Sequence, residues 1–144
     1  MKLDTMSGLK RTDYCGTLTI DKIGETVVVC GWAARQRDLG QLIFIDLRDR
    51  TGIVQLAFDD TTDREIFSKA FQVRSEYVLM AKGTVRKRSS VNPDIPTGEI
   101  EIEVTELKVL ASYIKCEKFS TFCVLNVLKS TFRVGGVDAL PANI

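Results

Sequence analysis

The segment 31–58 reads GWAARQRDLGQLIFIDLRDRTGIVQLAF and decides the fold. Apolar and polar residues alternate across its middle, a spacing that predicts a β-strand with two different faces. Ile43 and Ile45 share one face, while Phe44 shares the other with Asp46 and Arg48. An aromatic ring among charged side chains can stack an unpaired base, and nearby arginines can hold the phosphates. The segment therefore points to single-stranded nucleic acid, and to RNA in particular.

Three strands are predicted around this segment. Three consecutive valines favour a strand over residues 26–37, and Gly31 inside it indicates a bend or a close backbone approach. The sequence DLGQ at 38–41 predicts a turn into a second strand, which runs to about Asp49. The DRTG tetrapeptide at 49–52 is a good hairpin connection to a third strand, residues 53–58.

The period then changes to that of a helix. Thr62 and Glu65 match a capping box with Thr62 as the N-cap, and an apolar stripe that ends at Phe71 follows at helical spacing. Strand patterns return over residues 76–88 and again from Glu99 onward, where three glutamates alternate with apolar residues and are expected to face outward. The loop between these two strands contains two prolines, which exclude a central strand there.

Three strands, a helix and two strands are the element order of the OB-fold. That fold is a five-stranded, partly open Greek-key barrel (β-β-β-α-β-β) whose second and third strands present a face to oligonucleotides. We therefore predict an all-β domain with one helix over residues 11–111. Residues 1–10 show no periodicity and are predicted to be a flexible leader, and residues 112–144 form a divergent tail of uncertain structure.

The composition narrows the chemistry further. Twenty basic and 19 acidic residues nearly cancel, so any nucleic-acid footprint must be local. The absence of histidine excludes histidine acid–base catalysis and histidine-containing zinc sites. The four cysteines form no CxxC pair and are expected to be reduced thiols. The sequence has no secretory leader and no apolar run of membrane-helix length, so we expect a cytoplasmic protein that contacts no membrane.

Three blocks of the sequence resemble one family. These blocks are RTDYCG at 11–16, CGWAARQRDLGQLIFIDLRDRTGIVQ at 30–55 and NPDIPTGEIEIE at 92–103. Together they are similar to the N-terminal anticodon-binding domain of bacterial-type aspartyl-tRNA synthetases. The related asparaginyl and lysyl enzymes usually keep only part of this pattern. The resemblance implies a tRNA partner with an aspartate-type anticodon, which is a guanosine or its derivative, then uridine, then cytidine.

The resemblance also implies roles for single residues. The aromatic ring of Phe44 would stack on the middle anticodon base, and Gln55 would hydrogen-bond that uridine. Glu101 would help to read the first anticodon base, with Asn92 and its loop close to the same nucleotide. The arginines implied to contact bases or backbone are Arg35, Arg37 and Arg88. Ala34 and Gln36 depart from the family, which often has bulkier or basic residues at these positions.

The residue types fit these roles, although each has a plainer alternative. Phe44 is either a stacking platform, worth about 1–3 kcal/mol, or a core residue. Gln55 offers the donor and the acceptor that a uracil edge needs, or it is a solvated strand residue. Glu101 can accept two hydrogen bonds from guanine, or it is one of three solvated glutamates.

Arginine suits phosphates and base edges because its planar guanidinium can bond twice and can also stack. Arg86 and Arg88 come from a strand that would adjoin the strand of Arg35 and Arg37 in a barrel. The four side chains form one basic surface on this interpretation, and on the alternative they are ordinary solubilising charges.

The resemblance implies that full-length relatives carry a class II catalytic domain, which uses ATP and Mg²⁺ and forms most of a homodimer interface. This sequence has no room for that domain and no glycine-rich phosphate cradle. We therefore expect no catalysis, cofactor or metal for the chain alone. After Ala111 the resemblance stops, and a truncated or frame-shifted gene end and a divergent docking segment both remain open. A freestanding OB protein for single-stranded nucleic acid and a nonfunctional synthetase fragment remain alternative functions.

Overall fold

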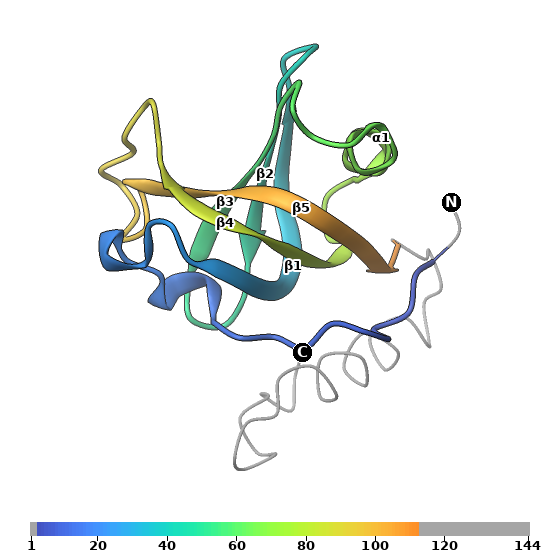
Figure 1. Ribbon diagram of the computed structural model, residues 1–144, viewed down its shortest axis with the longest axis horizontal. Coiled ribbons are helices and arrows are strands. Elements are labelled where there is room, and N and C mark those ends of the chain that lie inside the picture. Colours follow the sequence, from blue (N-terminus) through green and yellow to red (C-terminus); the bar gives the residue numbers. More distant parts are fainter. Residues whose placement is uncertain (1–2, 113–144) are drawn as a thin grey trace.

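Five strands and one α-helix follow one another in the order that the sequence predicts (Figure 1). The computed structural model describes residues 3–112. Its elements, in chain order, are the short 3-10 helices η1 (Cys15–Thr17) and η2 (Ile20–Lys22), then β1 (Thr26–Asp38), β2 (Ile43–Arg48), β3 (Ile53–Phe58), α1 (Arg64–Gln72), β4 (Val78–Lys87) and β5 (Ile100–Ala111). The predicted tail after residue 112 lies outside the described residues.

The strands close into a barrel in the order β1-β2-β3-β5-β4, with β4 hydrogen-bonded back to β1. Every neighbouring pair is antiparallel except β3 and β5, which run parallel. This parallel pair arises because the helical crossover through α1 brings the chain back beside β1 before β5 closes the gap. The topology is that of an OB-fold barrel, so the predicted fold class is confirmed.

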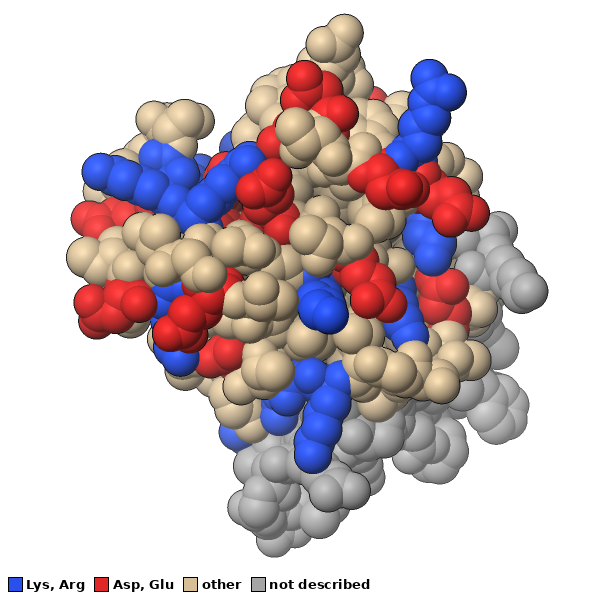
Figure 2. Space-filling model, in the orientation of Figure 1, with Lys and Arg blue, Asp and Glu red and all other residues tan. Residues whose placement is uncertain are grey.

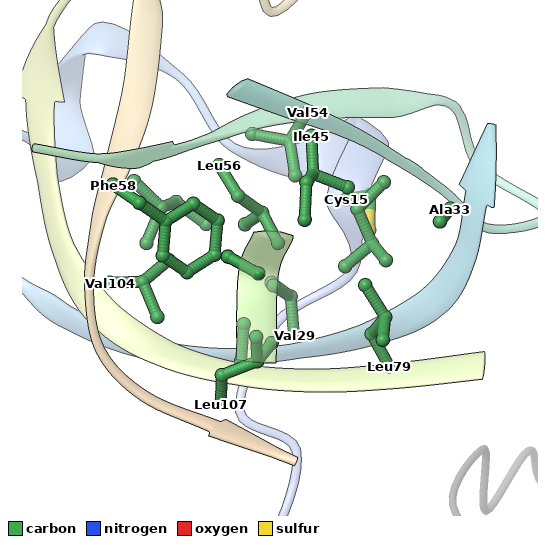
Figure 3. Close-up of a cluster of buried hydrophobic side chains, with 14 of the residues drawn as sticks. Cys15, Val29, Ala33, Ile45, Val54, Leu56, Phe58, Leu79, Val104 and Leu107 are labelled. Carbon is green, nitrogen blue, oxygen red and sulfur yellow. The ribbon is translucent and has the colours of Figure 1, made fainter. Parts of the chain in front are cut away.

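The barrel interior is filled by the apolar residues that alternation assigns to one face. Ile43, Ile45 and Leu47 of β2 have no exposed surface, and neither do Leu56 and Phe58 of β3. Figure 3 shows such side chains from several strands pointing into one shared interior. Because each strand buries one face in this way, its alternate residues are left for the outer surface.

Helix α1 packs on the barrel through buried Ala70, with Ile66 and Phe67 partly buried beside it. Gln36 of β1 fixes the C-terminal end of the helix, because its Nε2 donates to the carbonyl oxygens of Ala70 at 2.9 Å and Phe71 at 3.1 Å. The Phe71 side chain is 51% exposed, so the predicted apolar stripe ends one residue too late.

The predicted helix start is also wrong by one residue. Asp63, and not Thr62, is the N-cap, and its side chain accepts a hydrogen bond from the backbone N–H of Glu65 at 2.9 Å. The Thr62 hydroxyl accepts instead from the backbone N–H of Asp59, which closes the turn before the helix. Two adjacent residues that both favour N-caps made the position ambiguous, and the turn after β3 decided between them.

Gly31 marks a close approach of two strands. A Cβ atom at this position would lie 2.2 Å from the carbonyl oxygen of Arg48 on β2, so no other residue fits without backbone movement. This close approach is one of the two predicted explanations of a glycine inside β1, and it lets the long strand wrap around the barrel.

Residues 3–14 run along the outside of the barrel. Met6, Leu9 and Tyr14 cover a second apolar cluster that includes Cys30 and Met80. Closer to the N-terminus, Asp4 donates its backbone N–H to Val109 at 2.8 Å, and its carboxylate forms an ion pair with Lys69 of α1 at 3.1 Å. The structure thus gives defined contacts to part of the segment predicted as a leader. Among residues 3–112, no helix is long and apolar enough to cross a membrane.

Candidate nucleic-acid interface

Strand register aligns polar residues across the outer surface of the barrel. Because directly paired residues of neighbouring strands point to the same side, the pairing places a continuous row of side chains on one face. From β1 through β2, β3 and β5 to β4, these are Arg35, Asp46, Gln55, Glu101 and Arg86. Arg37 and Phe44 form the next cross-strand pair, directly beside this row.

Hydrogen bonds join four of these side chains into one chain, which we call the polar row: Arg37, Gln55, Glu101 and Arg86. Arg37 Nη2 donates to Gln55 Oε1 at 2.8 Å. Gln55 Nε2 donates to Glu101 Oε2 at 2.7 Å, and Arg86 Nε donates to Glu101 Oε1 at 2.7 Å. Gln55 accepts through its oxygen and donates through its nitrogen, and Glu101 accepts one hydrogen bond at each carboxylate oxygen, so the polar row leaves neither side chain unsatisfied.

The middle of the polar row is buried although it lies on the outer face. Gln55 is 3% exposed and Glu101 is 5% exposed, and each is hydrogen-bonded to the arginine at its own end of the row. The plain alternatives, a solvated glutamine and a solvated glutamate, are therefore wrong for these two positions. Of the other glutamates expected to face outward, Glu99 is exposed and Glu103 is partly exposed. A buried carboxylate persists only when it is paired, and Arg86 supplies the pairing here.

Phe44 lies on the outer face and not in the core. Its ring is partly exposed, while its neighbours Ile43 and Ile45 on the opposite face have no exposed surface. On one side Phe44 pairs with Ala57, which adds only a methyl group, and on the other with Arg37. The Arg37 guanidinium carbon lies 5.4 Å from the ring centroid, a cation–π contact that holds the arginine between the ring and Gln55.

Arg86 is tied to three carboxylates. Besides Glu101, its Nη1 lies 3.1 Å from an Asp59 oxygen and 3.4 Å from a Glu103 oxygen. Burial alone would lower the pKa of Arg86, but the hydrogen bonds and charges of these carboxylates outweigh burial and raise it. Carboxylates of the protein thus already neutralise the guanidinium charge. Arg86 is therefore better placed to hold Glu101 in position than to bind an RNA phosphate.

The remaining predicted site residues lie around this centre. Arg35 is exposed on β1, where it pairs across the strands with Asp46. Arg88 and Asn92 belong to the loop between β4 and β5, which starts next to the Arg86–Glu101 pair. The backbone N–H of Arg88 donates to Glu99 at 2.9 Å, while its buried Nε has no partner among the described residues. The Asn92 side-chain oxygen accepts from Asp94 at 3.0 Å, which shapes the loop.

Two acidic residues that were not predicted as site residues also belong to the site. Asp46 lies 3.3 Å from Arg37 and shares its outer face. Asp59 follows β3 and reaches Arg86 from the turn before α1. Alternation placed Asp46 beside Phe44, so its role could have been inferred; the contact of Asp59 depends on the barrel closure and had no signal in the sequence.

The face has mixed charge, because Arg35, Arg37 and Arg86 lie on it together with Asp46 and Glu101. The side of the molecule that Figure 2 shows has lysines and arginines interleaved with aspartates and glutamates, without a large area of one sign. Within residues 3–112, no three side chains of metal-binding type gather at one place. Chemically, the face offers a stacking ring, a fixed amide, a carboxylate with both oxygens bonded, and arginines at the edges. These groups suit recognition of base edges more than general attraction to a phosphate backbone.

Comparison with known proteins identifies the family of this barrel. The sequence pattern of the OB-fold nucleic acid binding domain matches residues 27–110, which is more than half of the chain. The chain belongs to this family. The OB-fold family thus covers all five strands and the helix, including every residue of the polar row.

Among curated relatives, the aspartate–tRNA(Asp/Asn) ligase of Caldanaerobacter subterraneus subsp. tengcongensis is 54% identical over 110 residues, which are 75% of this chain and 19% of that enzyme. The aspartate–tRNA ligase of Limosilactobacillus fermentum is 56% identical over 103 residues, 72% of this chain and 17% of that enzyme. The resemblance to aspartyl-tRNA synthetases predicted from three sequence blocks is confirmed. The chain spans only about a fifth of the length of these relatives.

Solved structures agree on the fold. The asparaginyl-tRNA synthetase from Pyrococcus horikoshii, complexed with asparaginyl-adenylate, has a TM-score of 0.62 and 25% identity, over 88% of this chain and 29% of that one. The OBody AM2EP06, bound to hen egg-white lysozyme, has a TM-score of 0.66 and 27% identity, over 73% of this chain and 97% of that one.

Proposed function

We propose that this OB-fold domain binds the anticodon loop of a tRNA and reads an aspartate-type anticodon on its outer face. The observation that carries the proposal is the placement of Phe44, a partly exposed ring, beside Arg37, which in turn hydrogen-bonds to Gln55 of the Gln55–Glu101 pair. A stacking platform next to fixed donors and acceptors is what recognition of an unpaired base requires. The similarity to aspartate–tRNA ligases supplies the class of nucleic acid.

In this proposal the middle anticodon base stacks on Phe44 and hydrogen-bonds to Gln55. Arg37 covers Gln55 in the free protein and moves aside to make room, because Gln55 is otherwise 3% exposed. Uracil fits this position, since its edge combines one N–H donor with carbonyl acceptors and the glutamine amide offers one of each.

The first anticodon base lies over Glu101, the other middle residue of the polar row. The base displaces part of what covers this 5% exposed carboxylate, and because each carboxylate oxygen can accept a second hydrogen bond, Glu101 accepts from the two N–H donors of guanine while it keeps its bonds to Gln55 and Arg86. The loop that carries Asn92 borders the same nucleotide. Arg35 and Arg88, at opposite edges of the face, contact the RNA backbone. Arg86 acts mainly by holding Glu101, because three carboxylates already surround it.

The chain alone, in this proposal, binds tRNA without aminoacylating it, and takes no cofactor or metal of its own. Its length corresponds to about a fifth of the ligases that it resembles, and ATP, Mg²⁺ and the dimer contacts of those enzymes are expected to involve the other four fifths. Cytoplasmic localisation belongs to the same proposal, because tRNA charging takes place there.

Titration of the purified chain with anticodon stem-loops tests the proposal. One stem-loop carries guanosine, uridine and cytidine as its anticodon, and the others each change one of these bases. We expect every change to weaken binding, the middle one by about 1–3 kcal/mol. Equal affinities for all stem-loops would instead favour the second candidate, an OB protein that binds single-stranded nucleic acid regardless of sequence. No measurable binding to any RNA would leave the nonfunctional fragment.

A further inference from the structure

The amide of Gln55 is held in one of its two possible orientations. A glutamine amide can rotate by half a turn, which exchanges its oxygen and its nitrogen at little cost when both positions face water. Here Arg37, which has only donors, faces one end at 2.8 Å, and the Glu101 carboxylate, which has only acceptors, faces the other end at 2.7 Å. Only the orientation with the oxygen toward Arg37 and the nitrogen toward Glu101 satisfies both neighbours.

Glu101 is the more permanent of these two neighbours. It is 5% exposed, and Arg86 holds its second oxygen at 2.7 Å. Arg37 is less fixed, because its side chain is 35% exposed and also lies 3.3 Å from Asp46. When a base approaches and Arg37 moves toward Asp46, Glu101 therefore still defines which end of the Gln55 amide is the nitrogen.

We propose that Glu101 makes Gln55 selective for uridine over cytidine at the middle anticodon position, by preventing the Gln55 amide from reversing. This inference rests on the proposed function. In the proposed function Glu101 contacts the first anticodon base. In this further inference Glu101 is also a positioning residue for the middle base, on which it acts through Gln55.

The chemistry of the two pyrimidines explains why orientation matters. Uracil presents an N3–H donor next to the O4 acceptor, whereas cytosine presents an N3 acceptor next to an amino donor. A glutamine amide pairs with either base, but the two pairings need opposite orientations of its oxygen and nitrogen. A freely rotating Gln55 would accept both bases. A fixed Gln55 accepts uracil, because reversal would place its oxygen against the Glu101 carboxylate.

The test compares affinities for two stem-loops that differ only by uridine or cytidine in the middle of the anticodon. The ratio of the two dissociation constants is measured for the unmodified chain, for Glu101→Gln and for Glu103→Gln. Any contact of Glu101 with the first base cancels in this ratio, because that base is the same in both RNAs. Glu103→Gln is a matched control, since Glu103 also lies on β5 beside Arg86 but has no hydrogen bond to Gln55.

We expect the unmodified chain to prefer uridine by between about 5-fold and about 150-fold. Glu101→Gln should reduce this ratio by at least about threefold, because a glutamine at 101 can donate to a reversed Gln55 amide. Glu103→Gln should leave the ratio unchanged. A preference that survives in Glu101→Gln would overturn the inference while the proposed function stands. An equal loss in both variants would also overturn it, since charge alone would then explain the effect. Absence of any preference in the unmodified chain would refute uridine reading itself.

A second measurement needs no RNA, and its first part uses only the unmodified chain. The Gln55 Nε2 hydrogens give separate signals in a nitrogen-15 NMR spectrum. The hydrogen that is donated to Glu101 should exchange slowly with water in the free protein, and faster in Glu101→Gln than in Glu103→Gln. Rapid exchange of both hydrogens in the unmodified chain would contradict a fixed amide.

Discussion

At the residue scale, Phe44 is a surface residue with a proposed role in binding. We predict that Phe44→Ala weakens binding of the aspartate-type stem-loop by about 1–3 kcal/mol, because a stacking surface for the base is lost. The same variant should change the free energy of unfolding only slightly, since the ring is partly exposed. Fluorescence titration and urea unfolding measure the two quantities on one preparation.

Phe58→Ala is the matched control for this prediction. Phe58 has no exposed surface and lies inside the barrel, so its loss should cost about 3–5 kcal/mol of folding free energy. A large loss of stability in Phe44→Ala, similar to that of Phe58→Ala, would show that Phe44 also belongs to the core.

Alternation along β2 separated Phe44 from Ile43 and Ile45, because period two assigns neighbouring residues to opposite sides, but it left open whether Phe44 belonged to the core. The structure places the face of Phe44 outside the barrel. The burial of Gln55 and Glu101 could not be predicted in the same way. Their positions on β3 and β5 are outward, and outward strand residues are usually solvated. What buries them is contact with Arg37 and Arg86 on other strands, which depends on register.

At the scale of elements, a substitution at the start of α1 can distinguish the observed N-cap, Asp63, from the predicted N-cap, Thr62. Asp63→Ala should destabilise the domain by about 0.5–2 kcal/mol, because the N–H of Glu65 loses its acceptor at the helix N-terminus. Asp63→Ser keeps a capping oxygen and should lose less. Urea unfolding measures both, and an unaffected Asp63→Ala would mean that Thr62 caps the helix after all.

The order of strands and helix could be predicted, while their pairing could not. Each strand has its own local pattern of apolar residues and turns, and these patterns are visible in the sequence. The parallel pairing of Gln55 with Glu101 joins residues from β3 and β5, which are separated by α1 and β4. Such a register follows from closure of the whole barrel. Residue type and resemblance could therefore predict the residues of the polar row, but not the hydrogen bonds that join them.

At the scale of the whole molecule, two aspartates couple folding to pH. Burial raises the pKa of Asp4, but hydrogen bonds from the Val109 N–H and Lys69 outweigh it, so the pKa lies below the ordinary 3.8. The Thr61 hydroxyl and Arg86 lower the pKa of Asp59 in spite of burial. Since the unfolded chain binds these protons more tightly, their stabilisation is present above about pH 4 and is lost as the pH falls further.

We therefore predict that the free energy of unfolding falls as the pH is lowered from about 4 to about 2. Asp4→Asn and Asp59→Asn, alone and combined, should each flatten this fall, because the substituted side chain no longer takes up a proton. Urea unfolding over a pH series is the measurement. An equally steep fall in the double variant would assign the acid sensitivity to other carboxylates.

The central claim is that the Phe44 ring and the middle anticodon base contact each other, and a double-mutant cycle tests it most directly. The cycle combines Phe44→Ala with a stem-loop that lacks only the middle base, and measures four dissociation constants by titration. If the ring stacks on that base, removing the base should weaken binding to the unmodified chain by about 1–3 kcal/mol more than it weakens binding to Phe44→Ala, which can lose only the hydrogen bonds of the base to Gln55. Equal losses in both proteins would show that ring and base act independently, and would contradict the account.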